Sequence, residues 1–141
     1  MEVNVNLLAI FLAAVSSMVI GSIWYTPKVF GNYWMKLAKI KPDKNISKLR
    51  LAWMYTFAFI TSFFTAYVLA HITFLSNKFF GGSFLYSALS TAFWVWLGFI
   101  ALRFRMHDMF EGRPSALSRL TVWNEAVTIF VMALIIGLMG A

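Results

Sequence analysis

The sequence predicts an all-α integral membrane protein: a bundle of four transmembrane helices with a short amphipathic helix at the membrane surface after the first span. Two observations carry this prediction. Of the 141 residues, 61% are hydrophobic and only 12% are charged, whereas soluble domains carry about 45–50% apolar and about 25% charged residues. The few charges are also separated by long uncharged stretches. This composition excludes an intrinsically disordered chain and argues against a soluble enzyme.

Four stretches are long enough to cross a bilayer, which takes about 20 mostly apolar residues in a helix. The hydrocarbon leaves no partner for open backbone groups, so each span is expected to be helical. All four are expected to form one domain over residues 1–141. The expected spans are, approximately, residues 4–26, 49–76, 82–103 and 117–140.

The positive charges indicate an orientation. Eleven of the 12 Lys and Arg residues lie in the segments 28–50 and 103–119, and only Lys78 lies in the remaining loop. Cytoplasmic loops are enriched in Lys and Arg, so we expect a multi-pass protein of the cell (plasma or inner) membrane with both basic segments cytoplasmic and both termini outside. The net charge of +7 then favours contact with anionic lipid of the inner leaflet rather than with nucleic acid.

The segment 28–40 has helical periodicity. Large apolar residues recur three or four positions apart while lysines fall largely between them, which predicts an amphipathic helix lying in the membrane surface. The alternative is an irregular loop with lysines that reach toward the headgroups. The apolar positions are Phe30, Tyr33, Trp34, Leu37 and Ile40.

Small residues recur every four positions in each span, which places them on one helix face and favours close helix packing. The four sets are Ala9, Ala13, Ser17 and Gly21; Ala58, Ser62, Ala66 and Ala70; Ser83, Ser87 and Thr91; and Ala133, Gly137 and Ala141. The bulky residues of these spans would then face lipid or a neighbouring subunit: Phe57, Phe59, Phe63, Phe64, Trp94 and Trp96. The chain has no cysteine, so it has no disulfide.

Glu125 is the one ionisable residue between Leu120 and Ala141, the apolar stretch that makes up most of the last span. It lies roughly 9 Å along the helix from Arg119. Ionisable groups at such depth tend to face the bundle interior or a water-filled cavity, which makes this position a candidate proton, cation or substrate site. The alternative is a structural ion pair with Arg103, Arg105 or Arg119. The polar stripe around it consists of Thr121, Asn124, Glu125 and Thr128.

Two further sets of ionisable residues are weaker candidates. His71, near the outer end of the second span, could relay protons or simply bond to a neighbouring helix. His107 and Glu111 are four residues apart beside Asp108, a spacing that can hold a metal on a helix. No second His or Cys completes that set, and nearby arginines would pair with the acids. We therefore expect no metal and no cofactor.

Two motifs resemble those of a known family. The first is Trp24-Tyr25-x-Pro27 followed by Phe30-Gly31-x-x-Trp34, and the second is Phe110-Glu111-x-Arg113-Pro114. Both resemble the membrane family called domain of unknown function 1761, and the resemblance would cover nearly the whole chain. It implies four helices but no activity. From the residues themselves, Pro27 and Gly31 would shape a chain reversal, and Glu111 and Arg113 could tie the two basic segments together.

Two functions remain open. The first is a small oligomeric transporter or channel with Glu125 as its titratable site; the oligomer is expected because four helices alone enclose little room. The second is a non-catalytic scaffold or accessory subunit of another membrane protein. No nucleotide-binding, zinc-protease or serine-hydrolase motif is present, so we expect no enzyme. A lipid-modifying enzyme using His107, Asp108 and Glu111 is a third, weaker hypothesis.

Overall fold

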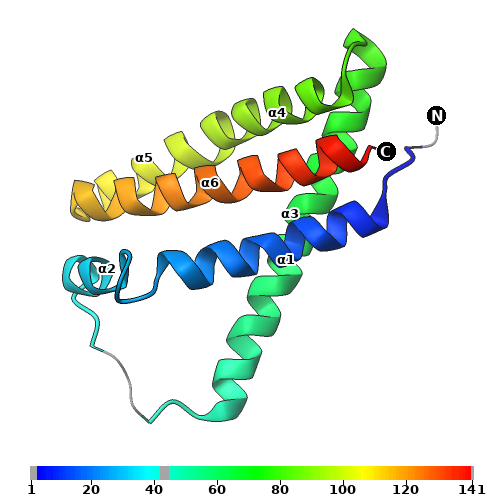
Figure 1. Cartoon of the computed structure of the whole chain (residues 1–141). Helices are drawn as coiled ribbons and strands as arrows, with labels where there is room; N and C mark the ends of the chain where they lie inside the picture. Colours follow the sequence, from blue (N-terminus) through cyan, green and yellow to red (C-terminus); the bar gives the residue numbers. More distant parts are fainter. Residues whose placement is uncertain (1–2, 42–44, 141) are drawn as a thin grey trace.

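A computed structural model describes residues 3–41 and 45–140, and every regular element within them is a helix (Figure 1). The all-α class is therefore confirmed. Residues 42–44 of the first basic segment and Ala141, the last member of the fourth set of small residues, lie outside the described ranges. The elements are α1 (Leu7–Trp24), α2 (Gly31–Ala38), α3 (Lys48–Phe80), α4 (Phe84–Val95), η1 (Trp96–Ala101), α5 (Leu102–Phe110) and α6 (Ser115–Met139).

Four helical stretches are long and apolar enough to cross a membrane. They are Leu7–Trp24, Lys48–Phe80, Phe84–Phe110 and Ser115–Met139. Length and composition together therefore indicate a multi-pass membrane protein, in line with the sequence.

The third stretch is longer than the span expected at residues 82–103. Helix α4 continues through η1 into α5 and ends at Phe110, because no glycine or proline interrupts residues 99–111. Gly112, at a φ of 67°, then ends the helical path. His107 and Asp108, expected in a loop, therefore lie in the last turns of a helix.

The segment η1 is a π-helical turn within this stretch, a feature that often marks functional positions. At its first residue, the indole Nε1 of Trp96 donates to the carbonyl oxygen of Val122 in α6 at 3.1 Å. The expectation that Trp96 faces lipid is therefore wrong, since its N–H needs a partner inside the bundle. Phe57, Phe64 and Trp94 are exposed, as expected. Phe59 and Phe63 are half-buried, and Phe63 packs against the core instead of facing away from it.

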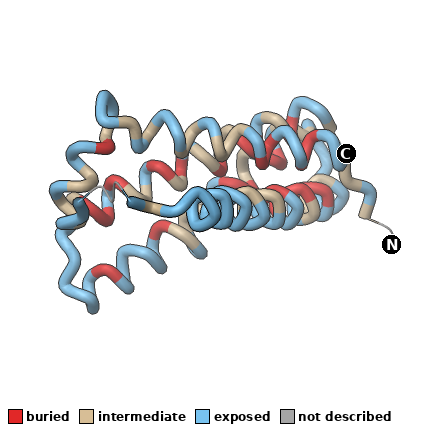
Figure 2. Tube along the Cα trace, turned by 90° about the horizontal axis from the view of Figure 1, so that it is seen from below, coloured by how far each residue is buried: buried red, intermediate tan, exposed pale blue. Residues whose placement is uncertain are grey.

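The hydrophobic core lies toward one end of the bundle. In Figure 1, α1, α6 and the α4–α5 stretch run side by side, and α3 crosses them steeply. Buried residues gather toward the end that holds the described chain termini (Figure 2). We call the other end, which carries the segments 25–50 and 103–119, the basic end. The buried core consists of Ile10, Ala13, Ala66, Leu69, Ala70, Ala88, Ala92, Ile129, Met132, Ala133 and Ile136.

Small residues account for this close packing. Ala13, Ala66 and Ala133 are fully buried, and Gly137 leaves no room for a side chain, because an added Cβ would lie 2.9 Å from Cα of Leu85 in α4. Toward the basic end the pattern no longer holds: Ala58 is exposed. The four sets of small residues therefore pack the helices tightly over about half of the length of the bundle.

The first part of α3 stands apart from the bundle. Within residues 48–60, which we call the α3 arm, every residue except the half-buried Phe59 is exposed. The arm begins at Ser47, whose side-chain oxygen accepts from the backbone N–H of Arg50 at 3.2 Å. Because the arm diverges from the other helices, a hollow remains between α3 and the α1–α6 pair.

The amphipathic segment forms a shorter helix than the expected 28–40. Helix α2 covers Gly31–Ala38, and the residues before it make a turn in which Thr26 O accepts from the backbone N–H of both Val29 and Gly31. Lys39, with a φ of 54°, ends the helix. Helix α2 packs against α6.

Candidate functional site

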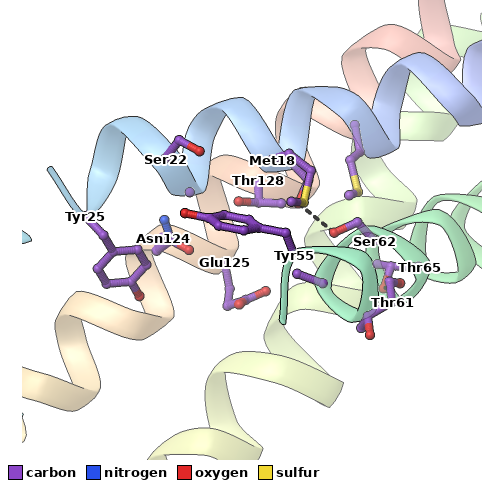
Figure 3. A pocket seen from close by; sticks show the side chains of 14 residues that line it. Met18, Ser22, Tyr25, Tyr55, Thr61, Ser62, Thr65, Asn124, Glu125 and Thr128 are labelled. Carbon is purple, nitrogen blue, oxygen red and sulfur yellow. Dashed lines mark hydrogen bonds between the residues drawn. The ribbon is translucent and has the colours of Figure 1, made fainter. Parts of the chain in front are cut away.

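A cavity of about 490 Å³ lies in the hollow between α1, α3 and α6 (Figure 3). Ten of the 14 described residues that line it carry a polar side-chain group, although it lies among apolar helices. The lining residues are Ser17, Met18, Gly21, Ser22, Tyr25, Tyr55, Ala58, Thr61, Ser62, Thr65, Asn124, Glu125, Thr128 and Met132. Its far side is closed by Ala13 and Ala66, one helical turn beyond Ser17 and Ser62, both fully buried. The cavity therefore occupies the basic half of the bundle.

Glu125 projects from α6 into this cavity (Figure 3). Within residues 3–41 and 45–140, no Lys or Arg lies within salt-bridge distance of its carboxylate: both ion pairs there belong to Arg113. The alternative of a structural pair with Arg103, Arg105 or Arg119 is thus not what the structure shows. A carboxyl group faces a polar cavity without a compensating charge.

Asn124 lies beside Glu125 and is almost completely buried, with 7% of its surface exposed. Among residues 3–41 and 45–140, its amide Nδ2 finds no hydrogen-bond partner, which is unusual because buried polar groups are nearly always paired. Thr128, one helical turn further, also lines the cavity. Thr121 does not: it lines a separate hollow at the basic end. Three of the four residues in the predicted polar stripe therefore line the cavity.

The opposite wall, on α3, consists mainly of hydroxyl groups. Thr61 Oγ1 donates to the carbonyl oxygen of Phe57 at 2.9 Å, and Thr65 Oγ1 donates to that of Thr61 at 2.9 Å. Ser62 Oγ lies 2.9 Å from Ser17 Oγ of α1. Because both threonine protons are used within the helix, their remaining lone pairs are free to accept.

Sequence reasoning missed much of this wall. It treated Ser17 and Ser62 only as small packing residues and did not single out Ser22, Tyr55, Thr61 or Thr65. A usable signal was present, since Thr61 and Thr65 are four residues apart in a strongly aromatic segment. That spacing gives one polar helix face.

His71 does not belong to this site. Its Nδ1 lies 2.9 Å from the carbonyl oxygen of Tyr67, and its ring stacks on the Tyr67 ring with centroids 4.2 Å apart. It lies in the half of α3 away from the cavity and is not part of the lining. Its contacts within α3 give a sufficient structural account.

Both acidic residues of the set His107, Asp108 and Glu111 pair with Arg113. Arg113 Nε lies 2.7 Å from Glu111 Oε2 and 3.7 Å from Asp108 Oδ1. In the part of the chain that the structure describes, no three His, Cys, Asp or Glu residues are placed to hold a metal ion. The pairing of Arg113 also stays within one segment, so it does not tie the two basic segments together directly.

The first motif forms the turn between α1 and α2. Trp24 packs on Phe30 with ring centroids 4.6 Å apart, and Tyr25 packs edge-on against Trp34 at 5.4 Å. Gly31 is required at its position, because a Cβ there would overlap the carbonyl oxygen of Tyr25 and lie 2.8 Å from Thr26 O. The motif therefore folds the chain back and fixes Tyr25 at the cavity.

The second motif lies beside the first. Glu111, Arg113 and Pro114 line a hollow of about 510 Å³ together with Trp34. Pro114 precedes α6, and its carbonyl oxygen accepts from the N–H groups of Leu117 and Ser118. Both motifs thus meet at the basic end, where they set the start of α6 relative to the end of α1.

Residues 8–137 match the model of a family described as protein of unknown function (DUF1761). The chain belongs to this family. The match covers nearly the whole chain, so it includes both motifs and every residue that lines the cavity. No curated protein and no solved structure matches the chain. The function must therefore be argued from the cavity.

Proposed function

We propose that this protein is a small membrane transporter or channel in which Glu125 binds a proton, a cation or a cationic solute. One observation carries the proposal: a polar cavity lies between helices that are apolar enough to cross a membrane, and the carboxylate in it has no ion pair. An uncompensated ionisable group in a span is costly, and such groups commonly mark ion or substrate pathways.

The packing supports a pathway with one open and one closed end. The cavity lies between the diverging helices of the basic half, while small residues close the other half. Passage to the far side would require α1 and α3 to separate beyond Ser17 and Ser62. Alternating access of this kind can arise from rocking of helices about a fixed site.

The test is flux into sealed liposomes that contain the purified protein. A pH gradient or a cation gradient should drive uptake by wild type, and Glu125→Gln should abolish its pH dependence, because an amide cannot exchange a proton. Glu111→Gln is the matched control, since it removes one carboxylate outside the cavity. Equal flux through wild type and Glu125→Gln would overturn the proposal.

For the orientation, we propose that the segments 28–50 and 103–119 face the cytoplasm and that both termini lie outside, with α2 on the inner membrane surface. The distribution of Lys and Arg supports this assignment, and the amphipathic sequence around α2 supports the surface position. Lys39→Cys should resist a membrane-impermeant thiol reagent added to intact cells. Rapid labelling there would reverse the topology. The chain has no native cysteine to interfere.

We further propose a homo-oligomer in which the α3 arm contributes to the contact. Trp53, Tyr55 and Phe57 each expose more than half of their surface there, and these large side chains offer a contact face to a second copy. Phe57→Cys should cross-link between copies in membranes, whereas Phe79→Cys, exposed at the other end of α3, should not. Equal cross-linking at both positions, or none, would contradict this contact.

The same arm favours a second candidate function, a non-catalytic scaffold or accessory subunit of another membrane protein. In that case the arm would pack against a different protein. The two functions differ in one readout, because a scaffold gives no Glu125-dependent flux in liposomes that contain only this chain.

A further inference from the structure

The lining of the cavity selects for positive charge. Glu125 carries the one formal charge among the described residues that line it, and none of them is Lys, Arg or His. Charge interactions are strong where water is scarce, so an anion would be repelled and a cation attracted. The mouth also contains the rings of Tyr25 and Tyr55 (Figure 3), and the faces of aromatic rings attract ammonium groups.

The walls then distinguish between kinds of cation. The hydroxyl groups of Thr61 and Thr65 donate within α3, so each presents lone pairs that can accept from an N–H donor. Asn124 instead offers a donor: its buried Nδ2 has no acceptor among the described residues. A complementary ligand therefore carries N–H donors on a positive nitrogen and an oxygen acceptor at another position.

The volume favours an organic ligand over a bare ion. Pockets for small molecules commonly measure about 300–1,000 Å³, and this cavity measures about 490 Å³. A proton or a dehydrated metal ion would leave most of that space unfilled. The described residues also hold no cluster of three acidic, His or Cys side chains.

We propose that the cavity binds a small organic ammonium ion that also bears a hydroxyl or carbonyl oxygen, with the nitrogen at Glu125 and the oxygen within reach of Asn124. This proposal rests on the proposed function in taking the cavity as the solute site, and it adds the chemical class of the solute. The tyrosine rings accommodate an apolar substituent next to the nitrogen.

Equilibrium binding to the full chain in lipid nanodiscs tests the proposal with three matched probes. Phenylethanolamine carries both the ammonium and the hydroxyl group, phenethylamine lacks the hydroxyl, and styrene glycol replaces the amine by a neutral hydroxyl. We expect saturable binding of phenylethanolamine, weaker binding of phenethylamine, and no competition from styrene glycol, sodium or potassium.

Variants assign the two contacts. Glu125→Gln should weaken phenylethanolamine binding about 10- to 100-fold, the range expected for a charged hydrogen bond, while Glu111→Gln should leave it unchanged. Glu125→Asp keeps the charge and should retain part of the affinity, which separates loss of charge from misfolding. Asn124→Ala should weaken phenylethanolamine but not phenethylamine, so that the two amines bind alike.

Three results would overturn the ligand class: equal binding of styrene glycol and phenylethanolamine, unchanged amine binding in Glu125→Gln, or displacement of the amines by sodium or potassium at equal concentration. These results are independent of transport. If amines bind but liposomes show no flux, the transporter fails and the ligand site stands. If Glu125-dependent proton flux occurs without amine binding, the ligand class fails and the transporter stands.

Discussion

The hydroxyl oxygens of Ser17 and Ser62 lie 2.9 Å apart and join α1 to α3 where the cavity meets the packed core (Figure 3). On one side of this bond are the polar walls of the cavity, and on the other side Ala13 and Ala66 are completely buried. The pair thus marks the boundary between the open and the closed half of the bundle.

A double-mutant cycle on this pair should reveal the bond. Ser17→Ala and Ser62→Ala each leave one hydroxyl without its partner, so their effects on the free energy of unfolding in detergent should not add. We expect a coupling of about 0.6 kcal/mol, the average for hydrogen bonds between membrane helices. Strictly additive effects would show that the two hydroxyls do not interact.

Gly137→Ala should destabilise the bundle although alanine is the better helix former. The added Cβ would lie 2.7 Å from Leu85 Cδ1 and 2.9 Å from Leu85 Cα, and the backbone of α4 would have to move away. Overpacking of this kind costs about 1–3 kcal/mol, against a gain in helix propensity of about 1 kcal/mol.

Gly98→Ala is the matched control, because no atom outside its own helix segment lies within 4 Å of a Cβ at that position. Thermal unfolding in detergent should therefore show a lower midpoint for Gly137→Ala than for Gly98→Ala. The reverse order would contradict the close contact between α4 and α6.

Gly31→Ala should disrupt the turn between α1 and α2. The three atoms nearest to its Cβ would be backbone atoms of Tyr25 and Thr26, which cannot rotate away as a side chain can. We expect a loss of at least about 2 kcal/mol and a changed near-ultraviolet circular dichroism signal, because Trp34 would lose its contact with Tyr25. A wild-type spectrum would show that the turn has more room than described.

Arg113→Gln should leave Asp108 and Glu111 without their shared cation. The arginine is about half exposed, with 55% of its side chain accessible, so solvent weakens the pair and we expect a cost of about 1 kcal/mol that falls as salt is added. Arg105→Gln removes the same charge where no ion pair is formed within residues 3–41 and 45–140. Equal unfolding midpoints for both variants would contradict a stabilising role.

Sequence reasoning reached the fold class and singled out Glu125, which lines the cavity, because both depend on local composition. Uninterrupted apolar stretches predict helices, and a lone carboxylate within one is conspicuous. The first motif was also interpretable locally, since Pro27 and Gly31 indicate a turn that the structure contains.

The cavity and its α3 wall could not be predicted, because they depend on how the helices are placed in three dimensions. Nothing in the periodicity of α3 shows that residues 48–60 diverge from the bundle, and this divergence is what brings Thr61 and Thr65 to a cavity wall. The extension of the third span to Phe110 was missed because charges at Arg103 and Arg105 were taken to end the helix. Charges limit the apolar stretch, but only Gly112 ends the helical backbone.

The central claim is that the Glu125 carboxyl group faces an open cavity in the membrane without an ion pair. Mass spectrometry after treatment of native membranes with dicyclohexylcarbodiimide, which forms stable adducts with protonated carboxyl groups in apolar surroundings, tests this claim most directly. We predict an adduct at Glu125 that decreases when phenylethanolamine is present. An unmodified Glu125 under conditions in which another carboxyl group of the same chain reacts would contradict the account.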